Sequence, residues 1–412
     1  MHPWLRCNPP IPVHHSAEQR GECLRPLRKA AISCAMTAHK LVAWGGYDAS
    51  KPRVRLLLDA LRRRGALTDE IAIDVWAGVE DKSVAGKGRA IAALMRLILG
   101  FPRAIIDLLR TDRGADVLLP YPGTPDIFVV ALFAKLQGRK LVLDAFLPIH
   151  DTIVGDRGMA KAGGLLSGLI RLFERAGFAL ADVILTDTDC HADFFASEYQ
   201  LPRKKFETVL VGAEDLFAPQ ANPAAIDGFA QLPKGKKIVL FYGQLIPLHG
   251  MPTILAASQI EPEEGVHWVI IGKGQLEDDL REFLASNPAC ANLTWVPWVD
   301  YERLPDVIAQ ADICLGVFGG SDKAARVIPN KLFQQLAMGK PVITRSSAAV
   351  DALAGDYPAT ILTVPPEDPP ALASAVKKAL GDTAALKGLP AETLRQLTPD
   401  AGVERLLARL KD

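Results

Sequence analysis

The sequence FYGQLIPLHG, residues 241–250, predicts the end of a strand, a glycine loop and the start of a helix. It completes the apolar run 238–242, which is typical of a buried parallel strand. Gly243 ends that strand, and we expect a helix to begin near Met251, because the proline that follows suits a first helical turn. Unpaired amides and the helix dipole would then point into the loop and form a socket for a phosphate. Two glycines alone are a weak signal for a phosphate site. The prediction is strengthened by a second segment, RVIPNKLFQQLAMGKPVIT, at residues 326–344.

Outward from this stretch, apolar runs alternate with helical segments along most of the chain. Such runs, separated by helices, predict parallel sheets that are covered on both faces. The expected strands are 41–44, 71–76, 117–120, 141–144, 183–186, 238–242, 268–271, 293–296, 313–317, 342–344 and 360–364. The expected helices include 52–64, 127–136, 164–179 and 391–410. We therefore predict an α/β protein with two doubly wound, Rossmann-like domains that face each other across a ligand-binding cleft.

The domain boundaries follow from changes in this pattern. Residues 1–38 show no periodicity and no signal-peptide pattern, so we expect a disordered tail or a mis-assigned start. The first domain is expected over 39–216, and a linker rich in Ala, Pro and Gly over 217–236. The second domain is expected over 237–385. The last helical segment, within 386–412, is expected to pack back on the first domain.

Composition excludes several classes of protein. The 412 residues exceed the roughly 250–300 at which single hydrophobic cores stop growing, so two domains are expected. Lys+Arg and Asp+Glu both number 47, so no net charge attracts nucleic acid. The six cysteines form no CxxC pair, which favours a reduced compartment, with Cys290 and Cys314 as core residues. No apolar run reaches the roughly 18–20 residues of a spanning helix, so we expect a cytoplasmic protein.

Several segments together resemble the retaining, nucleotide-sugar-dependent glycosyltransferases of family 4, of the group 1 type. GQLIPLHG takes the place of that family's G-R-L-x-x-x-K-G loop, and WVIIGKGQLEDDL, residues 268–280, is similar to its G-x-G segment. IPNKLFQQLAMGKPVIT resembles its P-x-x-x-x-E-A-M-A-x-G-x-P-V-V signature. In the first half, GGYDASKPRVRLLLDALRRRG and VLVGAEDLFAP are similar to the family's segments, so the resemblance runs from about Lys40 to about Asp382.

The resemblance implies a GT-B fold and a metal-independent hexosyltransferase. Such an enzyme moves a sugar from a nucleotide diphosphate to a cell-envelope polysaccharide or glycolipid acceptor, with retention and without a cofactor. The implied donor-binding residues are Gly46, Gly243, Gln244, His249, Gly250, Val299, Asn330, Lys331 and Gln334. The implied catalytic residues are Asp144, His150 and Arg326, with Asp151 beside His150.

Two positions depart from the family's pair of glutamates. The alignment puts Gln334 at the ribose-facing position, where an amide can still hydrogen-bond a hydroxyl. Arg326 stands at the sugar-facing position and cannot accept a hydrogen bond, so the contact differs or comes from Asp322. Gln244 and His249 replace the family's Arg and Lys on the phosphates. A protonated His249, with Arg326 or Lys331, would then supply the charge.

Other motifs have a structural explanation beside the functional one. Asp187-Thr188-Asp189 matches a metal-binding D-x-D, but capping of the next helix is favoured. Gly272-Lys273-Gly274 lacks the third glycine of a dinucleotide fingerprint, which argues against a nicotinamide enzyme. Trp298 suits a contact with the donor base and a core position equally well. A UDP-sugar epimerase of the same fold, or a non-catalytic donor-binding subunit, remains an open alternative.

The segment 87–110 is both apolar and basic. Arg recurs every seventh residue at 89, 96, 103 and 110, along one expected helical face, although Pro102 is expected to break or kink the helix. Two interpretations remain open: a helix on an anionic membrane surface, which would make the protein peripheral on the inner face of the membrane, or a lid with a solvated basic stripe.

Overall fold

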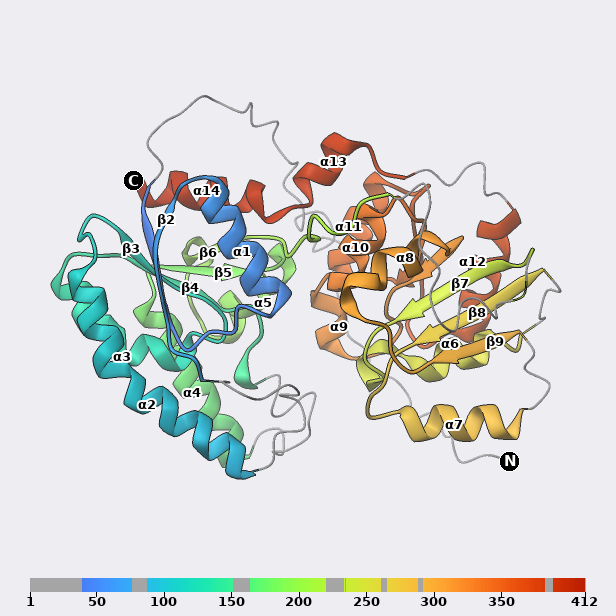
Figure 1. The fold of residues 1–412 in the computed structure, drawn as a ribbon, viewed down its shortest axis with the longest axis horizontal. Coiled ribbons are helices and arrows are strands. Elements are labelled where there is room, and N and C mark those ends of the chain that lie inside the picture. The colour runs from blue at the N-terminus through green and yellow to red at the C-terminus, as the bar shows by residue number, and fades with distance from the viewer. Residues whose placement is uncertain are drawn as a thin grey trace.

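The computed structural model describes residues 39–75, 87–150, 164–219, 233, 235–260, 265–287, 292–381 and 388–411. The expected tail over 1–38, Asp151 and Cys290 lie outside the described residues. Within them, two six-stranded sheets, all of whose strand pairs are parallel, form two units of the chain (Figure 1).

Both sheets have the strand order of a doubly wound fold. The first runs β2-β1-β3-β4-β5-β6 and the second β12-β11-β10-β7-β8-β9, so the order reverses beside β1 and beside β7. Ligands bind such sheets at the carboxyl ends of the strands near the reversal. The first sheet comprises β1 (Leu41–Gly45), β2 (Leu67–Ala72), β3 (Asp116–Leu119), β4 (Leu141–Asp144), β5 (Val183–Thr186) and β6 (Phe206–Thr208). The second comprises β7 (Lys237–Tyr242), β8 (Val266–Ile271), β9 (Leu293–Val296), β10 (Ile313–Leu315), β11 (Val342–Arg345) and β12 (Ile361–Val364).

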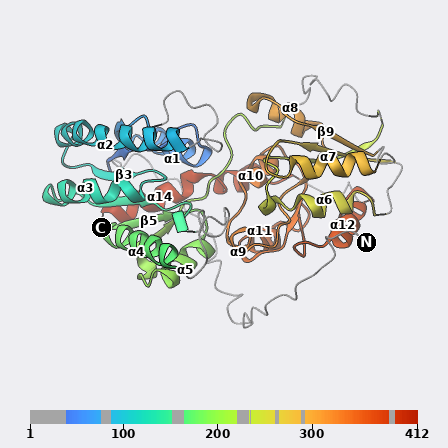
Figure 2. The same cartoon turned by 90° about the horizontal axis from the view of Figure 1, so that it is seen from below.

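Helices cover both faces of the first sheet. One face carries α2 (Lys87–Arg110), α3 (Thr124–Leu136), α4 (Leu165–Leu180) and α5 (Asp189–Glu198), whose buried side chains share a core with the strands. The other face carries α1 (Pro52–Arg63) and α14 (Pro399–Lys411). Figure 2 shows α2, α3 and α4 side by side. Within the described part of the chain, no helix is both long and apolar enough to cross a membrane.

The second sheet is covered in the same way. Its helices are α6 (Met251–Ala257), α7 (Glu277–Ser286) and α12 (Pro369–Gly381) on one side, with α8 (Leu304–Ala309), α10 (Asn330–Ala337) and α11 (Ala348–Asp356) on the other. Shorter helices are α9 (Asp322–Arg326) and α13 (Ala391–Gln396), with 3₁₀ turns at Arg203–Lys205, Pro247–His249 and Tyr301–Arg303. A cluster that contains Leu56 and Val211 of the first unit and Leu332 of α10 joins the two units. Cys314 is fully buried, as expected.

The structure differs from the expected elements in several places. The second strand was expected at 71–76 but lies at 67–72, because it is an edge strand whose exposed Thr-Asp-Glu looks like a loop. The three-residue strand β6 was missed because it is too short to show a period. Helix α2 does not break at Pro102, which was expected to break or kink it, but continues through that residue. The expected helix 391–410 is two helices, since Pro399 cannot extend α13 and begins α14.

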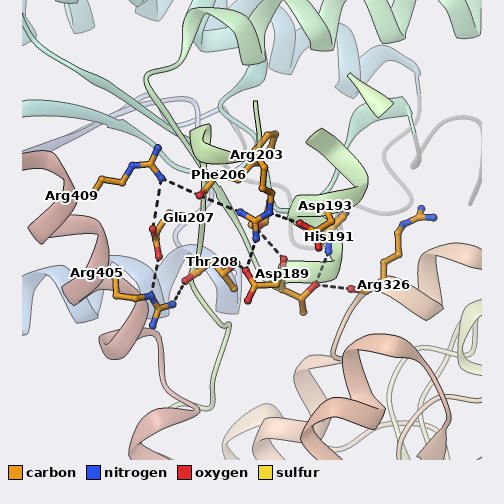
Figure 3. Close-up of polar contacts among 12 residues, drawn as sticks. Asp189, His191, Asp193, Arg203, Phe206, Glu207, Thr208, Arg326, Arg405 and Arg409 are labelled. Carbon is orange, nitrogen blue, oxygen red and sulfur yellow. Dashed lines mark hydrogen bonds and ion pairs between the residues drawn. The ribbon is translucent and has the colours of Figure 1, made fainter. Parts of the chain in front are cut away.

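The C-terminal helix α14 completes the first unit. Its Val403, Leu406 and Leu410 are buried in the same cluster as α1. Arg405 donates to a Glu207 oxygen of β6 at 3.0 Å, and Arg409 donates to the carbonyl of Phe206 (Figure 3). The chain therefore crosses from the second unit back to the first before it ends.

Candidate functional site

The loop after β7 needs glycine because two loops touch through their backbones. Gly243 has φ 143°, and its N–H donates to the carbonyl of Ile271 at 2.9 Å. A Cβ on Gly272, in the next loop, would lie only 1.9 Å from the Gly243 carbonyl oxygen. Glycine at both positions therefore allows the two loops to approach this closely.

Gly250 has a packing role that the phosphate-loop pattern does not reveal. Its φ is 70°, and a Cβ there would lie 2.6 Å from the backbone of Phe318 and Gly319. The expected helix start is confirmed, since α6 begins at Met251, but α6 has only seven residues. Gly250 is therefore required by backbone packing, and the short helix contributes little dipole to the loop.

The Lys331 ammonium lies directly against the bare face of Gly243. A Cβ on Gly243 would lie 2.9 Å from Nζ of Lys331, and this nitrogen stands 4.1 Å from the centre of the Phe241 ring. Lys331 is 8% exposed, and its Nζ has no hydrogen-bond partner. Burial lowers the pKa of Lys331 to about 7. A buried ammonium without a partner is costly, so an anion bound in this loop would remove an existing penalty.

His249 lies at the same loop but is not the cation that the sequence suggested. A carbonyl can only accept, so Nδ1 of His249 donates to the carbonyl of Gln244, 2.5 Å away. Burial, then the nearby Lys331 charge, lowers the pKa of His249 to about 3, so the ring is neutral at pH 7. The structure thus brings together Gly243, Gln244, His249 and Lys331, with Lys331 as the positive charge.

The Gln334 amide is part of a chain of hydrogen bonds between the two units. Tyr242 donates to Gln334 Oε1 at 3.0 Å, and Gln334 Nε2 donates to the Tyr301 hydroxyl at 2.9 Å. Tyr301 donates to Glu214 at 2.7 Å, and Arg55 of α1 pairs with the same Glu214 oxygen at 2.6 Å. An amide has two N–H donors and two acceptor lone pairs, so Gln334 retains one of each beyond its bonds to Tyr242 and Tyr301.

Arg326 reaches across to the first unit. Its guanidinium lies 3.8 Å from the centre of the Phe194 ring of α5, and its carbonyl accepts from the Thr188 hydroxyl at 2.7 Å (Figure 3). Asn330 begins α10, and its buried Oδ1 has no hydrogen-bond partner. Trp298 is 67% exposed, which excludes the core interpretation, and Val299 packs at the edge of the core.

Asp144 and His150 are both held by other side chains. Asp144 is 1% exposed and forms an ion pair with Arg53 of α1, with Nη2 to Oδ1 at 2.8 Å. Nε2 of His150 lies 2.8 Å from the Ser167 hydroxyl, and the His150 N–H donates to Glu174. Glu174 is fully buried, and burial raises its pKa. Asp144 thus has a counter-ion, and a buried carboxyl group positions the loop of His150.

Gly46 is bound to the start of α3. Its N–H donates to Oδ2 of Asp126 at 2.7 Å, and a Cβ on Gly45 would lie 2.2 Å from that same oxygen. Burial raises the pKa of Asp126 to about 6, although the bond from Gly46 opposes the shift. The first unit's glycine loop is therefore shaped around one carboxyl group.

Asp187-Thr188-Asp189 caps α5, as predicted. Thr188 is the N-cap, and its hydroxyl accepts from the N–H of His191. Asp189 pairs with Arg203 at 2.7 Å (Figure 3). Asp187 lies 2.7 Å from Nδ1 of His191. Among the residues that the structure describes, no group of three or more His, Cys, Asp or Glu side chains could hold a metal ion.

The sequence analysis missed the residues that support the site from a distance. These are Arg53, Asp126, Glu174, Glu214 and Tyr301. Glu214 stands within VLVGAEDLFAP and Asp126 in the first turn of α3, so motif position gave a partial signal for both. Arg53 stands within GGYDASKPRVRLLLDALRRRG, but no local pattern shows what Arg53 or Tyr301 contacts, because their partners lie far away in the sequence.

Comparison with solved structures defines the class of fold. HepE of Anabaena in complex with UDP matches with a TM-score of 0.59 and 12% identity, over 90% of this chain and 96% of that chain. Sucrose-phosphate synthase from Thermosynechococcus elongatus matches with a TM-score of 0.64 and 16% identity, over 90% and 97%. With its two parallel six-stranded sheets, the chain has the two-domain α/β GT-B fold.

Sequence comparison connects the second domain to one family. Residues 236–382 match the family model described as glycosyl transferases group 1. The chain is 26% identical over 265 residues to WcaI of Escherichia coli strain K12, whose name assigns it to glycosyl transfer in colanic acid biosynthesis. It is 28% identical over 171 residues to WbjE of Pseudomonas aeruginosa, whose name assigns it to the glycosyltransferases. These matches cover 60% and 40% of this chain, and 62% and 41% of the two relatives.

Proposed function

We propose that this protein is a retaining glycosyltransferase that moves a hexosyl group from a nucleotide diphosphate to a cell-envelope polysaccharide or glycolipid acceptor. The group 1 match over the second domain and the names of the two bacterial relatives support this class of reaction. The solved structures of HepE contain UDP and UDP-glucose, which supports a nucleotide-sugar donor.

One observation carries the proposal. The buried ammonium of Lys331 has no hydrogen-bond partner and lies against a glycine at the end of the central strand of the second sheet. A folded protein keeps such a group only if something compensates for its burial, and a diphosphate has the matching charge. Departure of a nucleotide diphosphate develops negative charge, which a fixed cation stabilises without a metal ion.

The other residues have roles that depend on their contacts. Backbone amides of the Gly243 loop would bind the diphosphate, and the neutral His249 ring would face a donor hydroxyl through Nε2, which can only accept. Asn330 Oδ1 and the remaining capacity of Gln334 suit sugar or ribose hydroxyls. His150 and Arg326 would contact the transferred sugar or acceptor, whereas Asp144 would act through its pair with Arg53.

Calorimetric titration with UDP, GDP and ADP, and then with the matching sugar nucleotides, tests the donor site. We expect one nucleotide to bind the wild type and not the variant Lys331→Met, which keeps the side-chain length and removes the charge. Lys237→Met is the matched control. Lys237 is the first residue of β7, at the end of that strand opposite Gly243, and it pairs with Asp312. No binding by the wild type, or unchanged binding by Lys331→Met, would contradict the proposal.

Turnover separates the two alternative functions. Release of an epimer or free sugar from a bound UDP-sugar without any acceptor would assign the site to an epimerase. Tight nucleotide binding without turnover in the presence of saccharide or polyprenyl-linked acceptors would leave a donor-binding subunit. Transfer with retained anomeric configuration supports the proposal as stated.

A further inference from the structure

The outer surface of the first domain exposes apolar side chains on three neighbouring helices. Helices α2, α3 and α4 lie side by side over one face of the sheet in both views (Figures 1 and 2). We call their outward surface the α2–α3–α4 face. Its exposed apolar side chains include Leu99, Ile106, Leu132, Leu136, Leu169 and Leu172. Leu99 is 72% and Leu132 63% exposed.

This pattern is unusual for the outside of a helical layer. A helix that covers a sheet normally has polar residues opposite its buried stripe. Here the buried stripe of α2 includes Ala93, Ala104 and Leu108, and the opposite side again presents Leu99 and Ile106. Exposed apolar side chains gathered on neighbouring helices mark a surface that binds a partner.

The aromatic pair between α3 and α4 makes the face continuous. Phe128 and Phe173 stack with their ring centres 4.7 Å apart, and each remains 39% exposed. They join the leucines of α3 to those of α4, so the apolar surface is not interrupted at the helix boundary.

The described charged side chains of this face are mostly basic. The exposed cations are Arg96, Arg103, Arg110, Lys135, Arg171 and Arg175, of which Arg171 pairs with Glu198 of α5. Of the acidic residues on the three helices, Asp107 is half-buried, whereas Asp126 and Glu174 are buried. The whole chain has equal numbers of acidic and basic residues, so this excess is local.

The arginines of α2 stand at the edge of its apolar surface. A spacing of seven residues shifts a side chain by only about 20° around a helix, so Arg96, Arg103 and Arg110 lie in one row. Leu99 and Ile106 lie beside that row. Arg103 and Arg110 approach Asp107 only at 3.7 and 3.6 Å with largely exposed side chains, and such pairs contribute little.

We propose that the α2–α3–α4 face binds the surface of an anionic lipid bilayer. Apolar side chains would enter the boundary between headgroups and acyl chains, and the arginines would contact the phosphates. A bilayer accepts a broad apolar surface without a shaped groove, and its negative charge complements the six cations. This binding does not depend on the reaction proposed above.

The location of the face connects it to that reaction. In a parallel sheet the helices begin at the carboxyl ends of the strands, so α2, α3 and α4 begin at the cleft side of the domain. If the proposed function is correct, a bilayer on this face would bring a lipid-linked acceptor to the cleft.

Vesicle co-sedimentation tests the proposal with the full chain. We expect retention on phosphatidylcholine vesicles that contain phosphatidylserine, and much weaker retention on phosphatidylcholine alone. Arg103→Gln/Arg110→Gln should lower the partition coefficient about 25-fold, at about fivefold for each arginine. Lys378→Gln/Arg395→Gln removes the same charge from exposed positions outside the face and should have little effect.

A second pair of variants tests the apolar contribution at constant charge. Leu99→Ser/Leu132→Ser should lower partitioning at least tenfold, whereas Leu216→Ser/Ile260→Ser, at exposed apolar positions elsewhere, should not. Absence of retention on anionic vesicles, or equal effects of the face and control variants, would overturn the proposal. A dimer in sedimentation that Leu99→Ser/Leu132→Ser dissociates, without vesicle binding, would assign the face to a second copy instead. Nucleotide binding is measured on the same protein preparations. It distinguishes a failure of the membrane proposal from a failure of the proposed donor site.

Discussion

The lowered pKa of Lys331 predicts that nucleotide binding takes up a proton. Lys331 has a pKa of about 7 in the structure because it is buried. At pH 8 only about one tenth of the molecules then carry the charge, so binding a diphosphate should take up about 0.9 proton. At pH 9 the charged fraction is about ten times smaller than at pH 8, and the affinity should fall about tenfold over that interval.

Calorimetry measures this uptake directly. The binding enthalpy is determined at pH 8 in several buffers of different ionisation enthalpy. The slope of the binding enthalpy against the ionisation enthalpy of the buffer gives the number of protons taken up on binding. The range from pH 7.5 to 9 avoids the terminal phosphate of the nucleotide, whose second ionisation lies near pH 6. His249 does not contribute, since its pKa of about 3 lies far below this range. A slope near zero would refute the reasoning.

The same residue should weaken the fold in the absence of a ligand. The pKa of Lys331 in the folded state lies below the ordinary value of 10.5. The loss of folding free energy caused by burying the charged form is therefore absent above pH 10.5 and grows as the pH falls towards 7. At pH 7 it amounts to at most about 4 kcal/mol, of which about 1–2 is offset by the contact with Phe241. Lys331→Met should therefore be about 2 kcal/mol more stable to urea at pH 7. A variant that is less stable than the wild type would show that Lys331 is structural.

Three further predictions concern the first domain. Asp144→Asn should cost about 3–5 kcal/mol in urea unfolding, because it leaves Arg53 buried without its counter-ion, and Arg53→Met in the same chain should recover part of that loss. Asp126 has a pKa raised from 3.8 to about 6, so the wild type loses the stability of its protonated form as the pH rises through 6. The melting temperature of Asp126→Asn relative to that of the wild type should therefore rise between pH 4 and 7. A difference in melting temperature that stays constant over this range would contradict the reasoning. Thr188→Val should lower the free energy of unfolding by about 1–2 kcal/mol through loss of the cap, whereas Thr188→Ser should retain most of it.

The sequence determined the architecture because its signals are local. Apolar runs such as 238–242 and 268–271 become central strands wherever helices separate them, and every expected strand of the second domain was found. The family resemblance put Gly243 and Lys331 among the implied donor-binding residues, and the structure places the Lys331 ammonium against Gly243. The edge strand β2 was misplaced because exposed edge residues do not follow a buried pattern.

The tertiary structure decided the charges and the partners at the site. No local pattern shows that Lys331 is buried without a partner, that His249 is neutral, or that Gln334 joins Tyr242 to Tyr301. The pair Arg53–Asp144 joins residues 91 positions apart, and α14 pairs Arg405 with Glu207 across 198 positions. Protonation depends on desolvation and on neighbouring charges, and folding brings both from distant parts of the chain. The sequence by itself therefore predicted which loops belong to the candidate site, and only the folded structure determined their electrostatics.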